Sequence, residues 1–547
     1  MERTSARRGA LSKRQPPCII ITMITKEMLS THWADITADK IIREKGEKDL
    51  YTCASGITPS GTVHIGNFRE IISVDLVVRA LRERGCNVRF IYSWDDYDVF
   101  RKVPKNMPEQ DKLATYLRKP ITLVPDTTNR ADNYARGNEL DVEEKLPLVG
   151  IYPEYLYQAQ RYRSSLYAEQ MKQALQCKAQ IIEILNKYRT EPLDDSWWPI
   201  AVFSRFTDKD NTTILSWDGE YSITYRDNDL DKEDTIDMRT TPFTKLHWRV
   251  DWPMRWVYEG VDFEPAGKDH HSQGGSFDTS KQVVELFGGH APVSFQYDFI
   301  SIKGRGGKIS SSSGEVVSLG DVLDIYTPEV ARYLFASTRP NTEFSISFDL
   351  DVLKIYEDYD NCERRYFGLL PVNEKKAAQE KRIYELSQVD KVPSVESYQI
   401  PFRHLCNLLQ INSGDIDKVI AGLEDVKPEQ LERLKTRCRC AWNWITQFSP
   451  EDFRFSLATE DSEPADLSEE ERRAVRALAS QVEQWDGQDE KNLAERVYAS
   501  AAEAGVENTV LFTAVYKALI GREKGPKLAL FMKTIGRERT LSILKKY

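Results

Sequence analysis

The chain has 547 residues, of which 41% are hydrophobic and 29% are charged, and its formal net charge is −10. A chain of this length can form two to four domains around a sizeable core. The acidic balance argues against nucleic-acid binding by overall charge, so a nucleic-acid partner would need a local basic face, and no apolar run approaches the length of a membrane span.

The N-terminal residues and the cysteines say little about chemistry. The 8 cysteines are scattered without a C-x-x-C pair, which favours reduced structural thiols in a cytoplasm over a disulfide framework. The apolar run Cys18 to Met23 is too short to favour a targeting peptide. We expect residues 1–25 to be a disordered extension, with Met23 as an alternative beginning, and residues 26–49 to form an amphipathic helix.

Residues 50–98 predict a β-turn-α-β unit. A short β-prone run ends in a turn that contains Gly56 and Gly61, and a mostly apolar helix over residues 68–81 follows. Glycines let the backbone approach a ligand, and a helix start presents unpaired N–H groups. His64 at this start adds a donor that can reach a phosphate. A plain structural turn is the alternative interpretation.

Three carboxylates follow the second strand of this unit, which we expect at Val88–Tyr92. They are Asp95, Asp96 and Asp98. In open α/β sheets, ligands bind at the carboxyl ends of the strands. The three acids therefore indicate a binding site, and a solvated acidic turn is the alternative.

Residues 100–245 are less regular and read as an insertion into the α/β domain rather than as part of its sheet. Polar loops precede a helix pair expected around Leu156 to Tyr188. Two alternating runs around Asp218-Gly219 predict a β-hairpin over Ile214 to Tyr225.

The sheet is expected to resume after this insertion. The sequence predicts a helix over Trp248 to Val261, a second helix over Thr279 to Phe287 and a strand over Val293 to Ile302. His270 and His271 have no partner cysteine or acid at metal-ligand spacing, so we expect no metal site here.

A loop with cations and hydroxyls, Lys303 to Gly314, comes directly after the expected strand. Such a loop suits a polyanion such as a triphosphate, although a charged Gly/Ser linker is the alternative. Further on, Asp321 to Ala336 is expected to form one helix, and helices continue to the C-terminus. Residues 517–547 are strongly basic, which indicates either a local nucleic-acid-binding patch or a solvated helical face.

Two short words resemble the signatures of one enzyme class. His64-Ile65-Gly66-Asn67, preceded by a Gly-Ile-Thr-Pro-Ser-Gly word, resembles the HIGH signature of class I aminoacyl-tRNA synthetases. Lys308-Ile309-Ser310-Ser311-Ser312 resembles the KMSKS signature in place and form. The flanking residues are similar to the class I lysyl-tRNA synthetase family. The similarity extends over nearly all of the chain from about Met23, and it is strongest in residues 50–104 and 262–320.

This resemblance implies an α/β Rossmann-type catalytic domain with an insertion, followed by an all-α C-terminal anticodon-binding domain. The implied ranges are 26–310 for the catalytic domain, with the insertion at roughly 100–245, then 311–390 for the KMSKS loop and stem-contact region, and 391–547 for the helical domain.

The resemblance also implies a lysine–tRNA ligase that activates lysine with ATP and transfers it to tRNA(Lys) in translation. Such a reaction needs no protein nucleophile, because the enzyme acts by positioning the substrates and stabilising the charge that develops. This agrees with a sequence that has phosphate-binding loops but no nucleophile–base pair. The implied partners are tRNA(Lys), lysine and ATP with Mg²⁺, without a membrane. We expect a cytoplasmic monomer.

Matched residue by residue, the family's motifs imply three sets of site residues. The catalytic set is His64, Asn67 and Lys308. The ATP-binding set is His64, Gly66, Asn67, Gly267, Asp269, Lys308, Ser310 and Ser311. The substrate-binding set is Gly56, Thr58, Asp95, Asp96, Trp248, His270 and Tyr297. The lysine ε-ammonium needs a buried anion, and the sequence leaves Asp95, Asp96 and Asp98 open for this role.

Two departures from the family pattern matter. Ser311 stands where the second KMSKS lysine is usual, so Lys308, or else Lys303 or Arg305, must carry that charge. Zinc-binding relatives use cysteine- and histidine-containing words in the insertion, and the corresponding stretches here contain neither residue. We therefore expect no protein-bound zinc.

Two alternatives remain at this point. One is a glutamyl or cysteinyl synthetase, although a glutamyl enzyme would want an arginine for the substrate side chain. The other is a non-catalytic tRNA-binding or regulatory paralogue, against which intact His64 and Lys308 argue.

Overall fold

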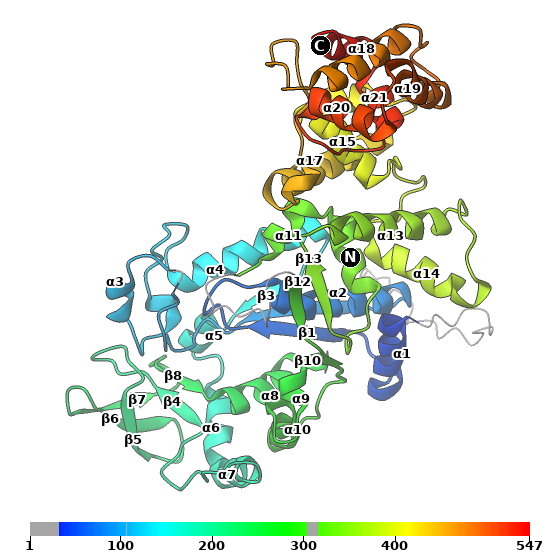
Figure 1. The fold of residues 1–547 in the computed structure, drawn as a ribbon. Coiled ribbons are helices and arrows are strands. Elements are labelled where there is room, and N and C mark those ends of the chain that lie inside the picture. The colour runs from blue at the N-terminus through cyan, green and yellow to red at the C-terminus, as the bar shows by residue number, and fades with distance from the viewer. Residues whose placement is uncertain (1–31, 106, 304–315) are drawn as a thin grey trace, which may run out of the picture.

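The computed structural model describes residues 32–105, 107–303 and 316–547. Figure 1 shows a body built around a parallel sheet, with a helical part that extends from one end of it. The predicted N-terminal extension, residues 1–25, lies outside the described residues. In the part of the chain that is described, no helix has both the length and the hydropathy needed to cross a bilayer.

The central sheet is parallel and has the strand order β3-β2-β1-β9. A bridge between Phe263 and Val293 and the parallel pair β10–β11 continue it on the β9 side. Counted along the chain, the order is 3-2-1-4-5, which corresponds to the first five positions of the 3-2-1-4-5-6 strand order of a Rossmann fold. The strands are β1 (Tyr51–Ile57), β2 (Val88–Trp94), β3 (Glu154–Tyr157), β9 (Val261–Phe263), β10 (Ala266–Gly267) and β11 (Gln296–Tyr297).

The predicted helix after β1 is present as α2 (Ile65–Glu83). Most of its apolar residues are buried because it lies between the sheet and two other helices, α1 (Trp33–Lys45) and α12 (Pro328–Ala336). Asp75 on α2 accepts a hydrogen bond from the fully buried Arg332 of α12 at 2.8 Å. The packing therefore fixes the start of α2 relative to the sheet.

The stretch between β2 and α8 (Trp248–Glu259) differs from the prediction, because the sheet strand β3 lies within the expected insertion. The strand β3 is only four residues long and continues directly into a helix. The sequence pattern of the whole stretch therefore predicts a helix. The hairpin prediction is confirmed, with Trp217 opposite Ile223, and a third strand extends it. These elements are α3 (Gln110–Ala114), α4 (Tyr134–Glu143), α5 (Gln158–Arg163), α6 (Ala168–Gln176), α7 (Lys178–Asn186), β4 (Ile200–Val202), β5 (Thr212–Trp217), β6 (Ser222–Asp227), β7 (Lys232–Asp237) and β8 (Thr244–Leu246).

Two other predicted elements are each divided in two. The single strand expected over Val293 to Ile302 is β11 and β12 (Ile300–Lys303), because β11 pairs with β10 while β12 pairs with β13 (Phe344–Ser347). The single helix expected over Asp321 to Ala336 is α11 (Leu319–Ile325) and α12. Pro328 opens α12, and a proline disfavours helical geometry in the residue before it. The remaining helices of the body are α9 (Lys268–His271), α10 (Ser276–Leu286), α13 (Asp351–Tyr366) and α14 (Glu374–Ser387).

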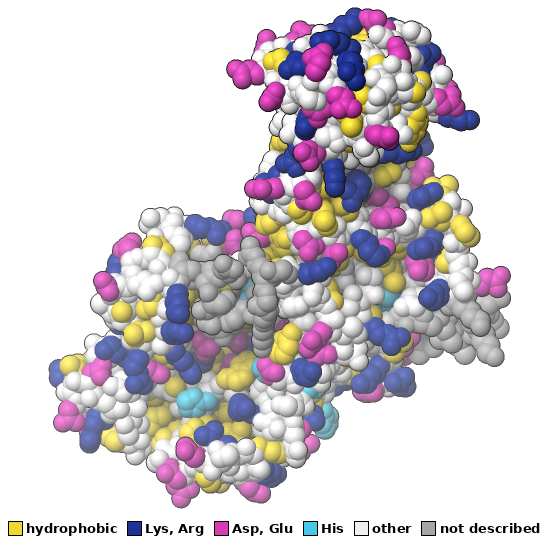
Figure 2. Space-filling view, in the orientation of Figure 1, with side chains coloured by type: hydrophobic (Ala, Val, Ile, Leu, Met, Phe, Trp, Pro, Cys, Tyr) yellow, Lys and Arg dark blue, Asp and Glu magenta, His cyan; other side chains and the backbone are white. Residues whose placement is uncertain are grey.

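The C-terminal part is helical, as predicted, and its last five helices enclose their own apolar core. Its basic residues are less available than the sequence indicates, because Lys517, Lys527 and Lys545 form ion pairs with acids of α18 and α19. Figure 2 shows Lys and Arg side chains interspersed with Asp and Glu over this end. The helices are α15 (Phe402–Ile411), α16 (Ile416–Ala421), α17 (Leu431–Gln447), α18 (Glu469–Glu483), α19 (Glu490–Ala504), α20 (Asn508–Ile520), α21 (Leu528–Ile535) and α22 (Arg537–Leu544).

Candidate functional site

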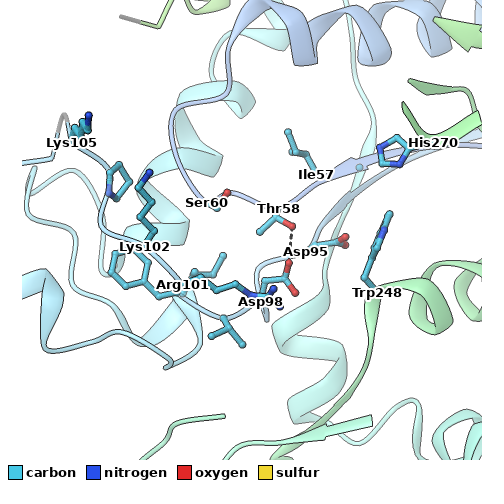
Figure 3. Close-up of a pocket in the computed structure, with 15 residues that line it drawn as sticks. Ile57, Thr58, Ser60, Asp95, Asp98, Arg101, Lys102, Lys105, Trp248 and His270 are labelled. Atoms are coloured by element: carbon cyan, nitrogen blue, oxygen red, sulfur yellow. Dashed lines mark hydrogen bonds between the residues drawn. The ribbon is translucent and has the colours of Figure 1, made fainter. Parts of the chain in front are cut away.

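A cavity of about 610 Å³ opens at the carboxyl ends of β1 and β2. A smaller recess of about 60 Å³ adjoins it, and the two share Gly56, Asp95, Trp248 and His270. Figure 3 shows Trp248 and His270 at one end of the cavity, Lys102 and Lys105 at the other, and Arg101 reaching toward Asp98 between them. The recess adds Glu70, Ser93, Trp252, Arg255, Glu264, Pro265 and Ala266 to its walls.

The turn between β1 and α2 depends on two glycines. A Cβ on Gly56 would lie 2.7 Å from the carbonyl oxygen of Ser93, so any side chain would force β1 and β2 apart. A Cβ on Gly66 would lie 2.9 Å from the ring of His64. Gly66 therefore lets the imidazole lie against the first turn of α2, and Asn67 Oδ1 accepts a hydrogen bond from the His64 N–H at 3.3 Å. The structure thus brings His64, Gly66 and Asn67 together at the start of a helix, where anions bind.

The chain returns to this turn just after the second signature. Ser318 bridges to His64, and the N–H of Ile65 donates to the carbonyl of Val317 at 2.8 Å. Lys308, Ser310, Ser311 and the alternative Arg305 lie outside the described residues. The other alternative, Lys303, ends β12 and forms an ion pair with Asp351.

Asp95 and Asp98 are each paired with a basic side chain. Asp95 accepts hydrogen bonds from the two terminal nitrogens of Arg255 at 2.7 and 3.1 Å. Asp98 accepts from the Thr58 hydroxyl at 2.9 Å and from the Lys245 ammonium. Burial alone would raise the pKa of Asp98, but Lys245 and these hydrogen bonds hold it below its usual value. We call Asp95 and Asp98 the outer acids.

Asp96 occupies a different place from the outer acids. It lines neither the cavity nor the recess, and its carboxylate accepts the N–H of Ala159 at 2.7 Å, in the first turn of α5. Burial raises the pKa of Asp96 to about 7. The side chain thus holds α5 against the end of β2 and is not part of the cavity wall.

Two glutamates in the recess, Glu70 and Glu264, have no ion pair among the described side chains, and we call them the inner acids. Glu70 accepts hydrogen bonds from the Ser55 hydroxyl at 2.7 Å, from the Gly56 N–H at 3.3 Å and from the Tyr297 hydroxyl. Glu264 accepts one from the Trp256 indole N–H at 2.6 Å. Burial raises the pKa of Glu70, and burial together with the charge of Glu70 raises that of Glu264 to about 7.

Neither inner acid was among the residues that the sequence predicted. Glu70 is an acid within a largely apolar helix, three residues after Asn67 and therefore on the same helix face. This position is the one feature of the sequence that could have indicated a role for Glu70 in the site. Glu264 directly follows β9 at its carboxyl end, which is where ligands bind in such sheets. No short motif links the two positions, because they meet only when β9 pairs beside β1.

Two of the other predicted substrate residues, Trp248 and His270, line both the recess and the cavity. Trp248 is 40% exposed and stacks on Trp252 with ring centres 4.9 Å apart. His270 shares a hydrogen bond with Ser276, and burial lowers its pKa, which favours the neutral imidazole at pH 7. The ring of Tyr297 lies beside Gly267, within 3.6 Å of where a Cβ would stand.

Asp269, the other residue of the predicted nucleotide-binding word, lies on the short helix α9 that follows Gly267. This helix lies on the β9 side of the sheet, beyond β10. Among the residues that the structure describes, no group of three or more His, Cys, Asp or Glu side chains is arranged to hold a metal ion.

Comparison with known proteins gives consistent matches. A family model described as "tRNA synthetases class I (K)" matches residues 31–390, and one described as "Anticodon binding domain" matches residues 419–547. A lysine–tRNA ligase of Borreliella burgdorferi is 55% identical over 521 residues, which cover 95% of this chain and 100% of that protein. One of Treponema pallidum is 54% identical, covering 95% and 99%. One of Thermococcus kodakarensis is 40% identical, covering 94% and 99%.

Proposed function

The chain belongs to the class I (K) family of tRNA synthetases, and from this premise we propose that it is a lysine–tRNA ligase. The reaction has two steps. The lysine carboxylate first attacks the α-phosphorus of ATP, forming lysyl-adenylate and releasing pyrophosphate. A ribose hydroxyl of the terminal adenosine of tRNA(Lys) then takes the lysyl group and releases AMP.

The observation that carries this proposal is the charge of the recess. Glu70, Glu264 and Asp95 line it, against the single guanidinium of Arg255, which is already shared between Asp95 and Asp251. A cationic side chain that enters would gain two carboxylate partners in a partly dehydrated site, where such pairing is strong. A glutamate side chain would instead meet like charge, which disfavours the glutamyl alternative.

The inner acids are therefore our candidates for binding the lysine ε-ammonium, in place of the acids that follow β2. The outer acids already have basic partners, and Asp96 does not line the cavity. The aliphatic part of the substrate would pass beside Trp248 and His270, which line both the recess and the cavity. Gly56 and Thr58 would then lie near its α-carbon end.

For the nucleotide, we propose that His64, Gly66 and Asn67 at the start of α2 hold the triphosphate, with Gly267 and Asp269 on the adenosine side. ATP would enter with Mg²⁺ as its counter-ion. Lys308, Ser310 and Ser311 complete the proposed set on the grounds of sequence alone. Lys308→Ala is expected to slow adenylate formation by about a hundred- to a thousandfold, as removal of a preorganised donor commonly does.

We further propose that the protein works in the cytoplasm as a monomer. The helical residues 419–547, which match the anticodon-binding family, would read the tRNA. Since Lys517, Lys527 and Lys545 are paired within this domain, the cations Arg522, Lys524, Lys533 and Arg539, for which the described residues supply no ion pair, are the better candidates for phosphate contact.

Amino-acid-dependent exchange of pyrophosphate into ATP tests the proposed function. The full-length protein should support exchange with lysine and not with glutamate or cysteine. Exchange with glutamate but not with lysine would overturn the substrate assignment. Absence of exchange with every amino acid, with tRNA binding retained, would favour the non-catalytic alternative.

A further inference from the structure

Arg69, on α2, is 2% exposed and has no ion pair among the described residues. Its two terminal nitrogens donate hydrogen bonds only to backbone carbonyls. The acceptors are Asp298 at 2.7 Å, Phe299 at 3.1 Å, Arg339 at 3.0 Å, Pro340 at 2.7 Å and Thr342 at 2.7 Å. Burial lowers the pKa of Arg69 to about 10, so the guanidinium is still charged at pH 7 and these hydrogen bonds are charge-assisted.

These carbonyls belong to two segments that meet at the end of β11. One segment connects β11 to β12 and the other connects α12 to β13, and the N–H of Asp298 donates to the carbonyl of Pro340 at 2.9 Å. The strand β11 is only two residues long, so its pairing with β10 gives it few hydrogen bonds of its own. Arg69 therefore fastens the end of β11 to α2.

The last residue of β11 donates to an inner acid. The hydroxyl of Tyr297 donates to Oε2 of Glu70, whereas the Ser55 hydroxyl and the Gly56 N–H both donate to Oε1. Among the described residues, Tyr297 is the one donor to Oε2. Two neighbouring side chains of α2 thus hold the end of β11, Arg69 through the backbone and Glu70 through the tyrosine hydroxyl.

The orientation of the Glu70 carboxylate matters for the proposed site. A carboxylate held at one oxygen only can turn about its terminal bond, and a bound cation must then stop that motion at a cost in free energy. With both oxygens held, the carboxylate is oriented before the ligand arrives. Arg69 itself lines neither the cavity nor the recess, so it acts on the substrate only through other residues.

We propose that Arg69 is a positioning residue for recognition of the lysine side chain. By fixing the end of β11, it places the Tyr297 hydroxyl against Glu70 and so orients the carboxylate that receives the ε-ammonium. This inference rests on the proposed function and adds a residue that lies behind the wall of the site. Its effect is on the choice of amino acid and not on ATP.

A second arginine of α2 offers a matched control. The terminal nitrogens of Arg79 also donate to backbone carbonyls, those of Gln388 at 2.8 Å, Gly150 at 2.9 Å and Val389 at 2.9 Å. None of these residues lines the cavity or the recess. Replacing Arg79 therefore reports the purely structural cost of removing such an arginine from this helix.

Aminoacylation of tRNA(Lys) by the full-length protein, with lysine and with norleucine, tests the inference. Norleucine lacks the ε-ammonium, so the ratio of the two kcat/KM values measures its recognition. Tyr297→Phe removes the hydroxyl and should lower this preference for lysine by about ten- to a hundredfold, as loss of a hydrogen bond to a charged group does. Arg69→Lys keeps the charge but not the planar fork, and it should lower the preference by about tenfold.

The loss in Arg69→Lys should lie mainly in the KM for lysine, with the KM for ATP within about twofold. Since Arg69 acts through the hydroxyl, R69K/Y297F should show no lower preference than Tyr297→Phe alone. Arg79→Lys should lower the midpoint of denaturant unfolding but keep the preference within about twofold, because it is remote from the recess. Phe344→Leu is a milder variant that serves if Arg69→Lys does not fold. It removes the ring that lies 5.1 Å from the guanidinium and should lower the preference by about threefold.

Several results would overturn the inference. They are an unchanged preference in Arg69→Lys or, where that variant does not fold, in Phe344→Leu, an equal fall of kcat/KM for both amino acids, and a loss of preference in Arg79→Lys as large as in Arg69→Lys. Additive effects in the double variant would exclude the route through Tyr297. An unsubstituted protein that charges tRNA(Lys) with neither amino acid, or with both equally well, would instead overturn the proposed function.

Discussion

The outer acids and the inner acids lie within one site but differ in their partners. Asp95 and Asp98 are close in sequence, follow a strand end and have the residue pattern of a cation site, yet each is neutralised by a basic side chain from a distant segment. Glu70 and Glu264 are far apart in sequence, and no basic residue among those described pairs with them. A local cluster of charges therefore does not identify the charge that is free to bind a ligand.

The physical reason is the free-energy cost of removing a charged group from water. A carboxylate removed from water must be paired or hydrogen-bonded, and an ion pair is the strongest of these solutions. The outer acids form such ion pairs within the fold, with Lys245 and Arg255. The inner acids have only neutral donors, so that part of their desolvation cost remains and raises their pKa. A ligand cation would relieve this cost.

The largest effect is expected at Glu70. Glu70→Gln should lower kcat/KM for lysine in the exchange reaction by about a hundred- to a thousandfold, because loss of one partner of a buried, hydrogen-bonded charge pair costs about 3–4 kcal/mol. Glu83→Gln, at the exposed end of the same helix, is the control and should change kcat/KM by less than about twofold. Equal effects of the two variants on kcat/KM would contradict the proposal that Glu70 binds the substrate ammonium, because an exposed acid would then matter as much.

A smaller effect, of a different kind, is expected at Asp98. Asp98→Asn replaces the carboxylate that accepts a hydrogen bond from the Lys245 ammonium with a neutral amide. The free energy of unfolding should therefore fall by about 1–3 kcal/mol in denaturant titration. The KM for lysine of the folded variant should change by less than about threefold. A loss of lysine affinity as large as that of Glu70→Gln would place the substrate ammonium at the outer acids instead.

A pH dependence should distinguish the two sets of acids. The pKa of Glu264 is raised to about 7, so its ionised fraction falls from about nine-tenths at pH 8 to about one-tenth at pH 6, while the substrate ammonium stays charged. The KM for lysine should therefore rise by up to about tenfold between pH 8 and pH 6. Asp98, whose pKa is lowered, contributes no change in this range. In Glu264→Gln the KM should be higher at pH 8 and should depend less on pH, and an unchanged pH profile would exclude Glu264.

Much of the fold could be predicted from the sequence, because its elements are marked locally. The period of apolar residues identified α2, and the Asp218-Gly219 turn identified the hairpin. The strand β3 and the division at Pro328 were missed, because the first is short and continuous with a helix, and the second lies within an otherwise helical pattern.

The candidate site was predictable only in part. The turn of His64, Gly66 and Asn67 is contiguous, so that its motif could be recognised. The pairing of Asp95 with Arg255 and the meeting of Glu70 with Glu264 depend on strand order and helix packing, which no local pattern contains. Sequence therefore indicated where a ligand binds, whereas the charge balance of the site required the structure.

The most direct test of the claim that the inner acids bind the ε-ammonium is a specificity ratio. We would measure kcat/KM for lysine and for norleucine, which lacks the terminal ammonium, by pyrophosphate exchange in the unsubstituted protein, in Glu70→Gln and in Asp98→Asn. The preference for lysine should fall by at least about a hundredfold in Glu70→Gln and stay within about threefold in Asp98→Asn. A preference retained in Glu70→Gln and lost in Asp98→Asn would contradict the assignment.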